Sequence, residues 1–257
     1  TTLNGEGLQH EDGHSHLISA TVPNCISWDP TFAFEVAVII QDGLRRMNSE
    51  QEDVYYYITL MNENYEHPPM PKGAEEGIRR GIYKLRPHKG KRGQPKVQLF
   101  GSGTILRSVE AAQGILEKYN VSADVWSVTS YNELRREAQA CERWNRLHPT
   151  SKSKVPYITQ VMEKEQGPVV AASDYMKILP DGIAKWVPGG ILSLGTDGFG
   201  RSDSRAALRR FFEVDAANVA AAALYRLAES GEIEKSVVSK AVKELKINPE
   251  APTPWTV

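Results

Sequence analysis

Strand-like and helix-like segments alternate along the chain after residue 96, and this alternation constrains the fold more than any other feature of the sequence. Val97–Phe100 and Ala123–Val128 have strand composition, and Thr104–Tyr119 between them has helical spacing. The series continues with a helix from Asn132 capped by Ser130 and Glu133, strands over Pro156–Met162, Pro168–Ser173 and Ile191–Leu194, and an alanine-rich helix from Asp215 to Gly231. This pattern predicts an α/β fold with a mostly parallel, doubly wound sheet covered by helices on both faces.

The upstream residues predict a smaller unit of the same class. Asp29 followed by Pro30 is typical of a helix start, and apolar residues at helical spacing predict a helix over 30–47. A strand over 53–60 and a helix over 74–85 follow. Residues 86–96 contain Gly, Pro and six basic side chains but almost nothing apolar, so they are interpreted as a linker between 1–85 and 97–257. The basic cluster could bind phosphate or an acidic partner, but a solvated linker is the favoured interpretation.

Composition limits the partners and the compartment. The 31 Lys and Arg residues nearly balance the 32 Asp and Glu residues, so no overall charge favours nucleic acid or a membrane surface. The two cysteines, Cys25 and Cys141, lie too far apart in sequence for a metal motif, and they form no disulfide framework. No apolar run reaches the length of about 18 residues that a membrane span needs, and no signal segment opens the chain. A cytoplasmic protein without a membrane anchor is expected.

A dense histidine cluster at residues 10–16 is the strongest candidate for chemistry. His10, Glu11 and His14 match the zinc-hydrolase pattern His-Glu-x-x-His, but that pattern works on a helix, and Gly5, Gly7 and Gly13 argue against one here. The favoured interpretation is a loop whose imidazoles, His16 included, line a pocket, shuttle protons or bind a carboxylate. A solvent-facing polar loop remains the alternative.

In a parallel sheet, functional loops lie at the carboxyl ends of the strands. The candidates are Gly101–Gly103, Thr129–Ser130, Ser173–Asp174 and the loop 195–204. Gly101-Ser102-Gly103 is similar to the start of a phosphate-binding turn, although tight packing between strand and helix explains the two glycines better. The glycine-rich loop 195–204, with Arg201 among its polar residues, is interpreted as a binding or interface loop.

Four longer segments carry a family resemblance: LNGEGLQHEDGHSH (3–16), YYYITLMNENY (55–65), CERWN (141–145) and LGTDGFGRSDSR (194–205). The chain resembles, over essentially its whole length, the homodimeric, bacterial type of pyruvate dehydrogenase E1 component. Members of that family have three domains in the transketolase arrangement. The resemblance implies that 1–85 is the end of the middle, pyrimidine-binding domain and that 97–257 is the transketolase-like C-terminal domain.

The resemblance also implies a function and a site. E1 uses thiamine diphosphate and Mg²⁺ to decarboxylate pyruvate and to transfer the acetyl group to the lipoyl group of its partner, the dihydrolipoyl acetyltransferase E2. By resemblance, His10 is the first choice for the catalytic histidine that contacts the substrate-derived adduct, and His14 and His16 are supporting candidates. The magnesium-diphosphate signature Gly-Asp-Gly with its downstream Asn is absent, so we expect this chain alone to be inactive. A non-catalytic dimerisation or docking fragment is the alternative.

Overall fold

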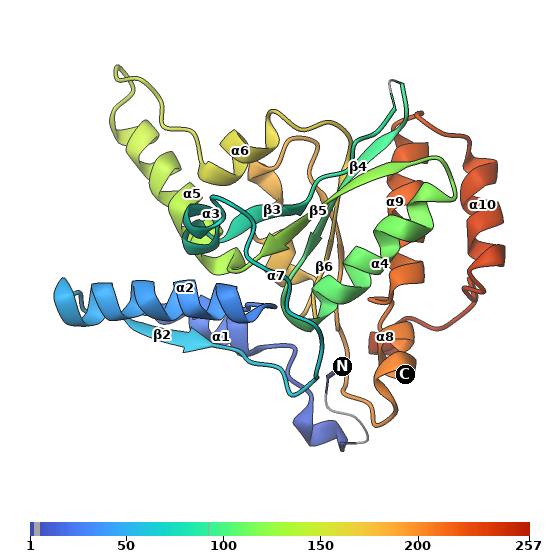
Figure 1. Ribbon diagram of the computed structural model, residues 1–257, viewed down its shortest axis with the longest axis horizontal. Helices are drawn as coiled ribbons and strands as arrows, with labels where there is room; N and C mark the ends of the chain where they lie inside the picture. The colour runs from blue at the N-terminus through green and yellow to red at the C-terminus, as the bar shows by residue number, and fades with distance from the viewer. Residues whose placement is uncertain (3–5, 92) are drawn as a thin grey trace.

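Two β-sheets organise the chain, and helices pack around them (Figure 1). This computed structural model describes residues 1–2, 6–91 and 93–257. Leu3–Gly5 of the first resemblance segment and Arg92 of the expected linker therefore lie outside the described residues. The strands are β1 (Cys25–Trp28), β2 (Tyr55–Ile58), β3 (Ile82–Arg86), β4 (Lys96–Gly101), β5 (Ser122–Val128), β6 (Val169–Ala172) and β7 (Ile191–Leu194). The α-helices are α1 (Ser15–Ala20), α2 (Ala33–Leu44), α3 (Glu75–Arg80), α4 (Leu106–Glu117), α5 (Tyr131–Leu147), α6 (Tyr157–Met162), α7 (Ile178–Asp181), α8 (Arg205–Phe211), α9 (Ala216–Glu229) and α10 (Lys235–Glu244).

Shorter helical turns complete the described elements. They are the 3-10 helices η1 (Leu8–His10), η3 (Gly103–Ile105), η4 (Ala184–Trp186) and η5 (Pro254–Thr256), and the π-helical turn η2 (Arg45–Ser49), which extends α2. In the part of the chain that the structure describes, no helix is both long and apolar enough to cross a bilayer. Cys25 and Cys141 are both buried and unpaired, as their spacing predicted.

The larger sheet has the strand order β3-β5-β4-β6-β7. Strands β4 to β7 run parallel, whereas β3 pairs antiparallel with β5 at one edge. The chain moves from β4 to β5 on one side and then crosses to β6 on the other, so the strand order reverses at β4. The prediction of an α/β fold with a mostly parallel sheet is confirmed.

Alternating side chains of this sheet bury into two different cores. Val97 and Leu99 of β4 pack in the core under α4 and α9, while Phe100 packs in the core under α5, α6 and α7. Figure 1 shows α4, α9 and α10 on one side of the sheet and α5 and α6 on the other. Both faces are covered, which explains why these strands read as near-continuous apolar runs in the sequence.

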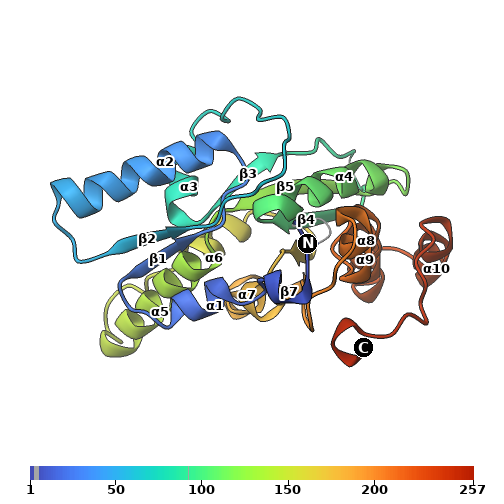
Figure 2. The same ribbon diagram turned by 90° about the horizontal axis from the view of Figure 1, so that it is seen from below.

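The smaller sheet consists of β1 and β2 in parallel, with Cys25 opposite Tyr55. Figure 2 shows α2 on one side of these two strands and α1 on the other. Ile26 and Trp28 of β1 belong to the same core as Leu99, so apolar packing joins the smaller sheet to the larger one. Asn132 at the start of α5 strengthens this junction, because its Nδ2 donates to the carbonyl of His16 and to Ser27 Oγ, both at 2.7 Å.

The start of α2 differs from the expectation. Asp29 does not cap the helix, which begins at Ala33. Instead, Glu35 accepts hydrogen bonds from the backbone N–H groups of Thr31 and Phe32 at 2.5 and 2.9 Å. A glutamate in the first turn can satisfy these free amides, so the side chain of Asp29 is left for another role.

Two expected elements have the wrong type. The helix expected over 74–85 ends at Arg80, because Gly81 adopts φ 102°, and the following residues form β3. The strand expected over Pro156–Met162 is the helix α6, in which Ile158 and Met162 are both buried. Their spacing of four residues is helical, although the local composition favours a strand.

The division at 86–96 stays a prediction. However, β3 lies upstream of the expected linker and pairs with β5, so the larger sheet already begins at Ile82. The remaining expected helices and strands agree with the structure to within a few residues, and Ser130 and Asp215 both accept the expected capping hydrogen bonds, from Glu133 and Asn218.

Candidate active site

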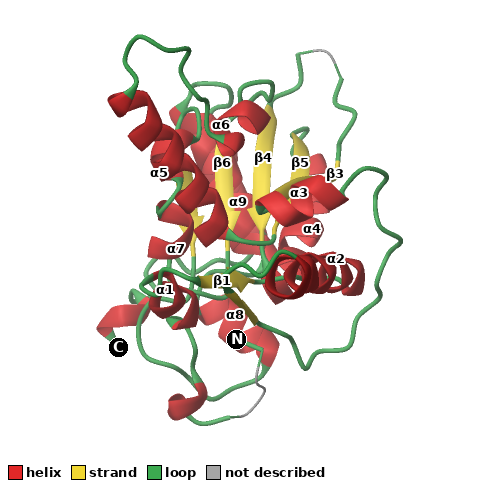
Figure 3. Ribbon diagram, turned by 90° about the vertical axis from the view of Figure 1, so that its left-hand side faces the viewer, coloured by secondary structure: helices red, strands yellow, loops and turns green. Residues whose placement is uncertain are grey.

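A cavity of about 360 Å³ opens where the loop after β2 meets the loops after β6 and β7. Its floor and walls come from β2, from the loops after β2, β6 and β7, from η1 and from α8. The described lining residues are Thr1, Thr2, Glu6, Gly7, His10, Glu11, Asp12, Tyr57, Ile58, Thr59, Leu60, Met61, Asp174, Tyr175, Arg201, Leu208 and Phe212. Figure 3 shows this end of the molecule, where α1, η1 and α8 gather below the carboxyl ends of the strands.

His10 lines this cavity from the end of η1. Its side chain is about half exposed, and its Nε2 lies 3.6 Å from Glu6 Oε2, so the ring forms an ion pair when it is protonated. An accessible imidazole with a neighbouring carboxylate can take up, hold or release a proton at a bound ligand. Of the three candidate histidines, His10 is therefore the one whose position allows direct contact with a ligand.

His14 lies outside the described lining and is exposed. It is the residue before α1, and its Nδ1 is 3.9 Å from Glu11 Oε2. Asp12 caps α1 instead, because its Oδ1 accepts from the N–H groups of His14 and Ser15. Residues 10–14 do not form one helix, and no group of three metal-ligating side chains occurs among the described residues. The helical context that the zinc-hydrolase pattern requires is missing.

His16 is buried just behind the cavity wall. Its Nε2 lies 3.1 Å from Thr59 Oγ1, and its ring packs edge-on against Tyr57 and Tyr175, with ring centroids 5.6 and 4.5 Å away. Burial lowers the pKa of His16 to about 4, so the ring is neutral at pH 7. Tyr57, Thr59 and Tyr175 all line the cavity, so His16 supports the wall and does not face the ligand.

Thr59 also contacts Asp29, a fully buried carboxylate. Its hydroxyl donates to Asp29 Oδ1 at 2.8 Å, while Asp29 Oδ2 has no hydrogen-bond partner among the described residues. Burial raises the pKa of Asp29 to about 7, opposed by hydrogen bonds from Ser102 and Thr59 and reinforced by the charges of Asp174 and Glu35. Asp29 therefore keeps its proton to a much higher pH than an exposed aspartate does.

The Asp29 carboxyl group also lies close to the turn Gly101-Ser102-Gly103, which bears on the role of its two glycines. Gly103 has φ 47°, and a Cβ placed there would lie 2.5 Å from Asp29 Oδ1. A Cβ at Gly101 would lie 2.8 Å from Leu106 Cα at the start of α4, so this glycine allows the strand and the helix to pack closely. The preference for a packing role at these glycines is confirmed.

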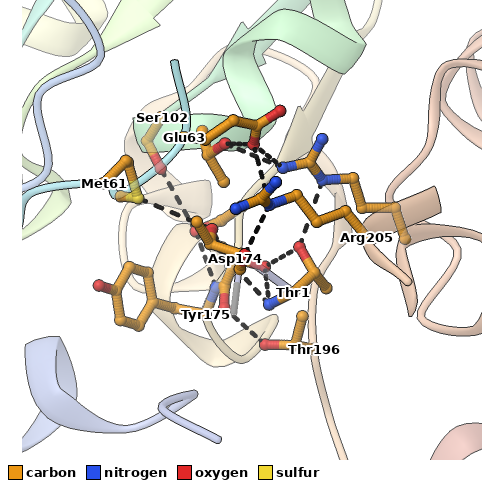
Figure 4. Close-up of polar contacts among 12 residues, drawn as sticks. Thr1, Met61, Glu63, Ser102, Asp174, Tyr175, Thr196 and Arg205 are labelled. Atoms are coloured by element: carbon orange, nitrogen blue, oxygen red, sulfur yellow. Dashed lines mark hydrogen bonds and ion pairs between the residues drawn. The ribbon is translucent and has the colours of Figure 1, made fainter. Parts of the chain in front are cut away.

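The reversal in strand order lies at the carboxyl ends of β4 and β6. There Ser102 Oγ donates to Ser173 Oγ at 3.3 Å, and Ser173 Oγ accepts from the N–H of Tyr175. The next residue, Asp174, reaches the cavity and accepts from the hydroxyls of Thr1 and Thr2 at 2.7 and 3.1 Å (Figure 4). The loop Ser173–Asp174 thus connects the buried end of β6 to the cavity, as expected for such a position.

Arginines of α8 join the loop after β2 to the other side of the cavity. Arg209 pairs with Glu63 and also donates to Thr104 Oγ1 at 3.0 Å. Arg205 donates from Nε to the carbonyl of Thr2 at 2.7 Å and lies 3.9 Å from Glu63. Figure 4 shows Arg205 and Glu63 pointing toward each other beside Asp174. These contacts hold α8 to Thr2, to the loop after β2 and to η3.

Glu11 adds a second carboxyl group beside His10. Its Oε1 is buried and has no hydrogen-bond partner in the described part of the chain. Burial raises the pKa of Glu11, and the nearby His14 opposes this rise.

Of the loops predicted from the strand ends, two reach the cavity and two do not. Asp174 and Arg201, from Ser173–Asp174 and 195–204, line it, whereas Gly101–Gly103 and Thr129–Ser130 are buried against the smaller sheet. The sequence interpretation missed Tyr57, Thr59 and Leu60. Thr59 and Leu60 directly follow β2, where the strand-end rule applies, whereas Tyr57 lies inside the strand.

Two family models match the chain. The model described as "Pyruvate dehydrogenase E1 component middle domain" matches residues 1–68, and the model described as "Transketolase-like TK C-terminal domain" matches residues 81–215. The second match begins at the residue before β3, where the larger sheet starts.

Curated relatives are similar over nearly the whole chain. Pyruvate dehydrogenase E1 components from Escherichia coli K12 and Pseudomonas aeruginosa are 59% and 57% identical over 99% of this chain, and the one from Cupriavidus necator is 52% identical over all of it. The chain spans 28–29% of the length of these relatives.

Solved structures share the fold at low identity. A transketolase from Pichia stipitis aligns with a TM-score of 0.64 and 17% identity, covering 90% of this chain and 29% of that one. A transketolase from Leishmania mexicana aligns with a TM-score of 0.59 and 16% identity, covering 98% of this chain and 30% of that one. Together with the relatives and the family models, these similarities show that the chain belongs to the pyruvate dehydrogenase E1 family and corresponds to a C-terminal portion of such a component.

Proposed function

We propose that this chain supplies one wall of the active site in a pyruvate dehydrogenase E1 component that decarboxylates pyruvate with thiamine diphosphate and Mg²⁺ and passes the acetyl group to the lipoyl group of an E2 acetyltransferase. The observation that carries the proposal is the position of His10 in a cavity built from both matched regions of the chain. A homodimer in the cytoplasm is part of the same proposal.

The cavity fits one side of a cofactor site. His10, Tyr57 and Leu60 would border the reacting end of the cofactor, while the chain lacks the Gly-Asp-Gly signature that would hold a magnesium diphosphate. When bound, thiamine diphosphate supplies the electron sink for decarboxylation. The diphosphate and the metal would then be held by residues outside this sequence.

The residues of this chain have separate tasks in that site. His10 binds the substrate carboxylate when its ring is protonated, and it exchanges a proton with the ligand when its ring is neutral. Glu6 pairs with the charged ring at 3.6 Å. Neutral His16 holds Thr59 and the two tyrosines in place, while Leu208 and Phe212 give the cavity an apolar side that excludes water.

The first prediction tests His10 in the full-length component. We expect His10→Ala to lower turnover of pyruvate by about 100-fold or more, the usual loss for a removed acid–base group. Affinity for thiamine diphosphate should stay close to that of the unchanged protein, since the diphosphate is held elsewhere. His14→Ala is the matched control, because His14 is exposed and is not among the described lining residues, so it should matter much less. Steady-state kinetics and cofactor titration measure both quantities, and unchanged turnover in His10→Ala would refute the assignment.

A titration of this chain alone separates the proposal from a chain that holds the complete cofactor site. We expect no tight binding of thiamine diphosphate with Mg²⁺, because the diphosphate signature is absent from the sequence. Tight binding would show that the described cavity holds the whole cofactor, contrary to the proposal.

A further inference from the structure

The C-terminal segment 254–256 folds back onto the glycine-rich loop 195–204 (Figure 2). Gly198 has φ 105°, and a Cβ placed there would lie 2.7 Å from the carbonyl oxygen of Pro254 and 3.0 Å from Trp255 Cα. Two backbones therefore touch at this point, which requires the absence of a side chain at residue 198. Pro254 is buried by the contact.

Lys177 connects the same two segments through its side chain. Its Nζ lies 5.1 Å from the ring centroid of Trp255 and 3.7 Å from Asp197 Oδ2. The backbone N–H of Lys177 also donates to Asp197 Oδ1. Trp255 therefore packs on both the loop and the lysine that holds the start of the loop.

The loop then runs to Arg201 in the cavity wall. Arg201 is the one lysine or arginine among the described lining residues, and its guanidinium carbon lies 5.2 Å from the ring centroid of Phe211. The position of Arg201 therefore depends on the path of the loop backbone and on this contact with Phe211.

We propose that the segment 254–256 acts as a strap in which Trp255 is a positioning residue: by packing on Gly198 and Lys177, it holds the loop 197–203 so that Arg201 stays in the cavity wall. This inference rests on the proposed function only in taking the cavity as the site of a 2-oxo acid. A fixed positive charge in the wall then favours binding of the substrate carboxylate. Loss of the strap should raise the KM for the 2-oxo acid more than it lowers kcat.

The test compares three variants of the full-length component. Trp255→Ala removes the ring, Trp255→Phe keeps an aromatic face for Lys177, and Tyr225→Ala removes a similarly exposed aromatic side chain from α9 as a control. The first readout is the rate of native-state trypsin cleavage after Arg201, followed by mass spectrometry. We expect Trp255→Ala to speed this cleavage by about 2- to 5-fold, the change that one exposed cation–π contact allows, while the other two variants stay near the unchanged protein.

The second readout is the KM and kcat for pyruvate. We expect the KM of Trp255→Ala to rise by a similar factor and Trp255→Phe to restore it. Gly198→Ala, which forces the loop away from Pro254, should give the same pattern as Trp255→Ala. Unchanged cleavage in both Trp255→Ala and Gly198→Ala would overturn the strap, and faster cleavage with an unchanged KM would overturn its role in positioning Arg201. Failure of the proposed function would be seen separately, as normal turnover in His10→Ala.

Discussion

Thr59 contacts two buried groups, His16 and Asp29, whose ionisation changes the stability of the protein with pH in opposite directions. Its Oγ1 lies 3.1 Å from His16 Nε2 and 2.8 Å from Asp29 Oδ1. Burial lowers the pKa of His16 from 6.5 to about 4, so the unfolded chain binds this proton more readily. The contribution of neutral His16 to the free energy of unfolding is fully present above about pH 6.5. About 3 kcal/mol of this free energy is lost as the pH falls toward 4.

The ionisation of Asp29 changes the stability of the protein with pH in the opposite direction. Burial raises its pKa from 3.8 to about 7, so the folded protein keeps a proton that the unfolded chain releases. The contribution of protonated Asp29 to the free energy of unfolding is fully present below about pH 4. About 4 kcal/mol is lost as the pH rises toward 7. Between these limits the two residues largely offset each other.

Replacement of Asp29 should expose the contribution of His16. We expect Asp29→Asn, which cannot ionise, to gain stability relative to the unchanged protein as the pH is raised from 5 to 8. The measurement is the denaturant midpoint of the full-length protein at several pH values. Asp53→Asn is the control, since Asp53 is exposed and lies two residues before β2. A constant difference between Asp29→Asn and the unchanged protein across this range would contradict the assignment of the titration to Asp29.

Only part of the candidate site could be predicted from the sequence. His10 could be proposed from the histidine cluster and the resemblance, and Asp174 and Arg201 from their positions after strands. The different environments of His10, His14 and His16 could not be foreseen, because they depend on where η1 ends and α1 begins and on Tyr175, which is distant in sequence. The unpartnered Oδ2 of Asp29 likewise depends on the approach of Gly103.

At the level of elements, Glu35 connects α2 to the larger sheet. Its Oε2 accepts the two backbone amides at the start of α2, while its Oε1 accepts from Tyr83 of β3 at 2.7 Å and Ser127 of β5 at 2.6 Å. Burial raises the pKa of Glu35, and these four hydrogen bonds oppose the rise. One carboxylate thus fixes the angle between a helix of the smaller unit and two strands of the larger one.

Substitution of Glu35 should therefore lower the free energy of unfolding by more than the loss of a single hydrogen bond does. We expect Glu35→Gln to destabilise the protein by about 2–4 kcal/mol, because the amide group of Gln turns a donor toward groups that are themselves donors. Tyr83→Phe removes one hydrogen bond and should cost about 1 kcal/mol. Chemical denaturation of both variants provides the comparison, and equal losses would show that Glu35 is no more than one of several independent contacts.

The element types that sequence predicted correctly are those in which local pattern and tertiary burial agree. β4, β5, α4 and α9 are long or strongly periodic, and they are buried where their pattern requires. The errors at 82–85 and 156–162 have another origin. Ile82 and Tyr83 form a strand because β5 offers them an edge, and α6 forms because Ile158 and Met162 both find the core under α5. Such pairing partners are far away in the sequence, so a local window could not include them.

At the level of the whole molecule, α2 beside the smaller sheet exposes apolar surface that the larger sheet and its helices do not cover. Ile40 and Leu44 lie one turn apart on α2 and are 47% and 59% exposed, while Val38 and Ile39 of the same helix are buried. A helix that is apolar on two faces normally packs on both. The smaller sheet has two strands, and the chain spans 28–29% of the length of its E1 relatives. We infer that the remainder of the component covers this face of α2.

This inference predicts how the chain behaves when it is produced alone. We expect the isolated chain to self-associate through the outer face of α2, because exposed apolar patches favour association. Leu44→Lys should reduce this association, as measured by sedimentation over a range of concentrations. Ile178→Lys is the matched control, since Ile178 is 58% exposed but lies on α7 beside the larger sheet, and this substitution should change the association little.

In the full-length component, where the face is covered, Leu44→Lys should instead lower the free energy of unfolding by about 1–3 kcal/mol, because it buries a charge without a partner. Association that is unaffected by Leu44→Lys in the isolated chain, together with no loss of stability in the full-length component, would show that this face of α2 is open to solvent in both.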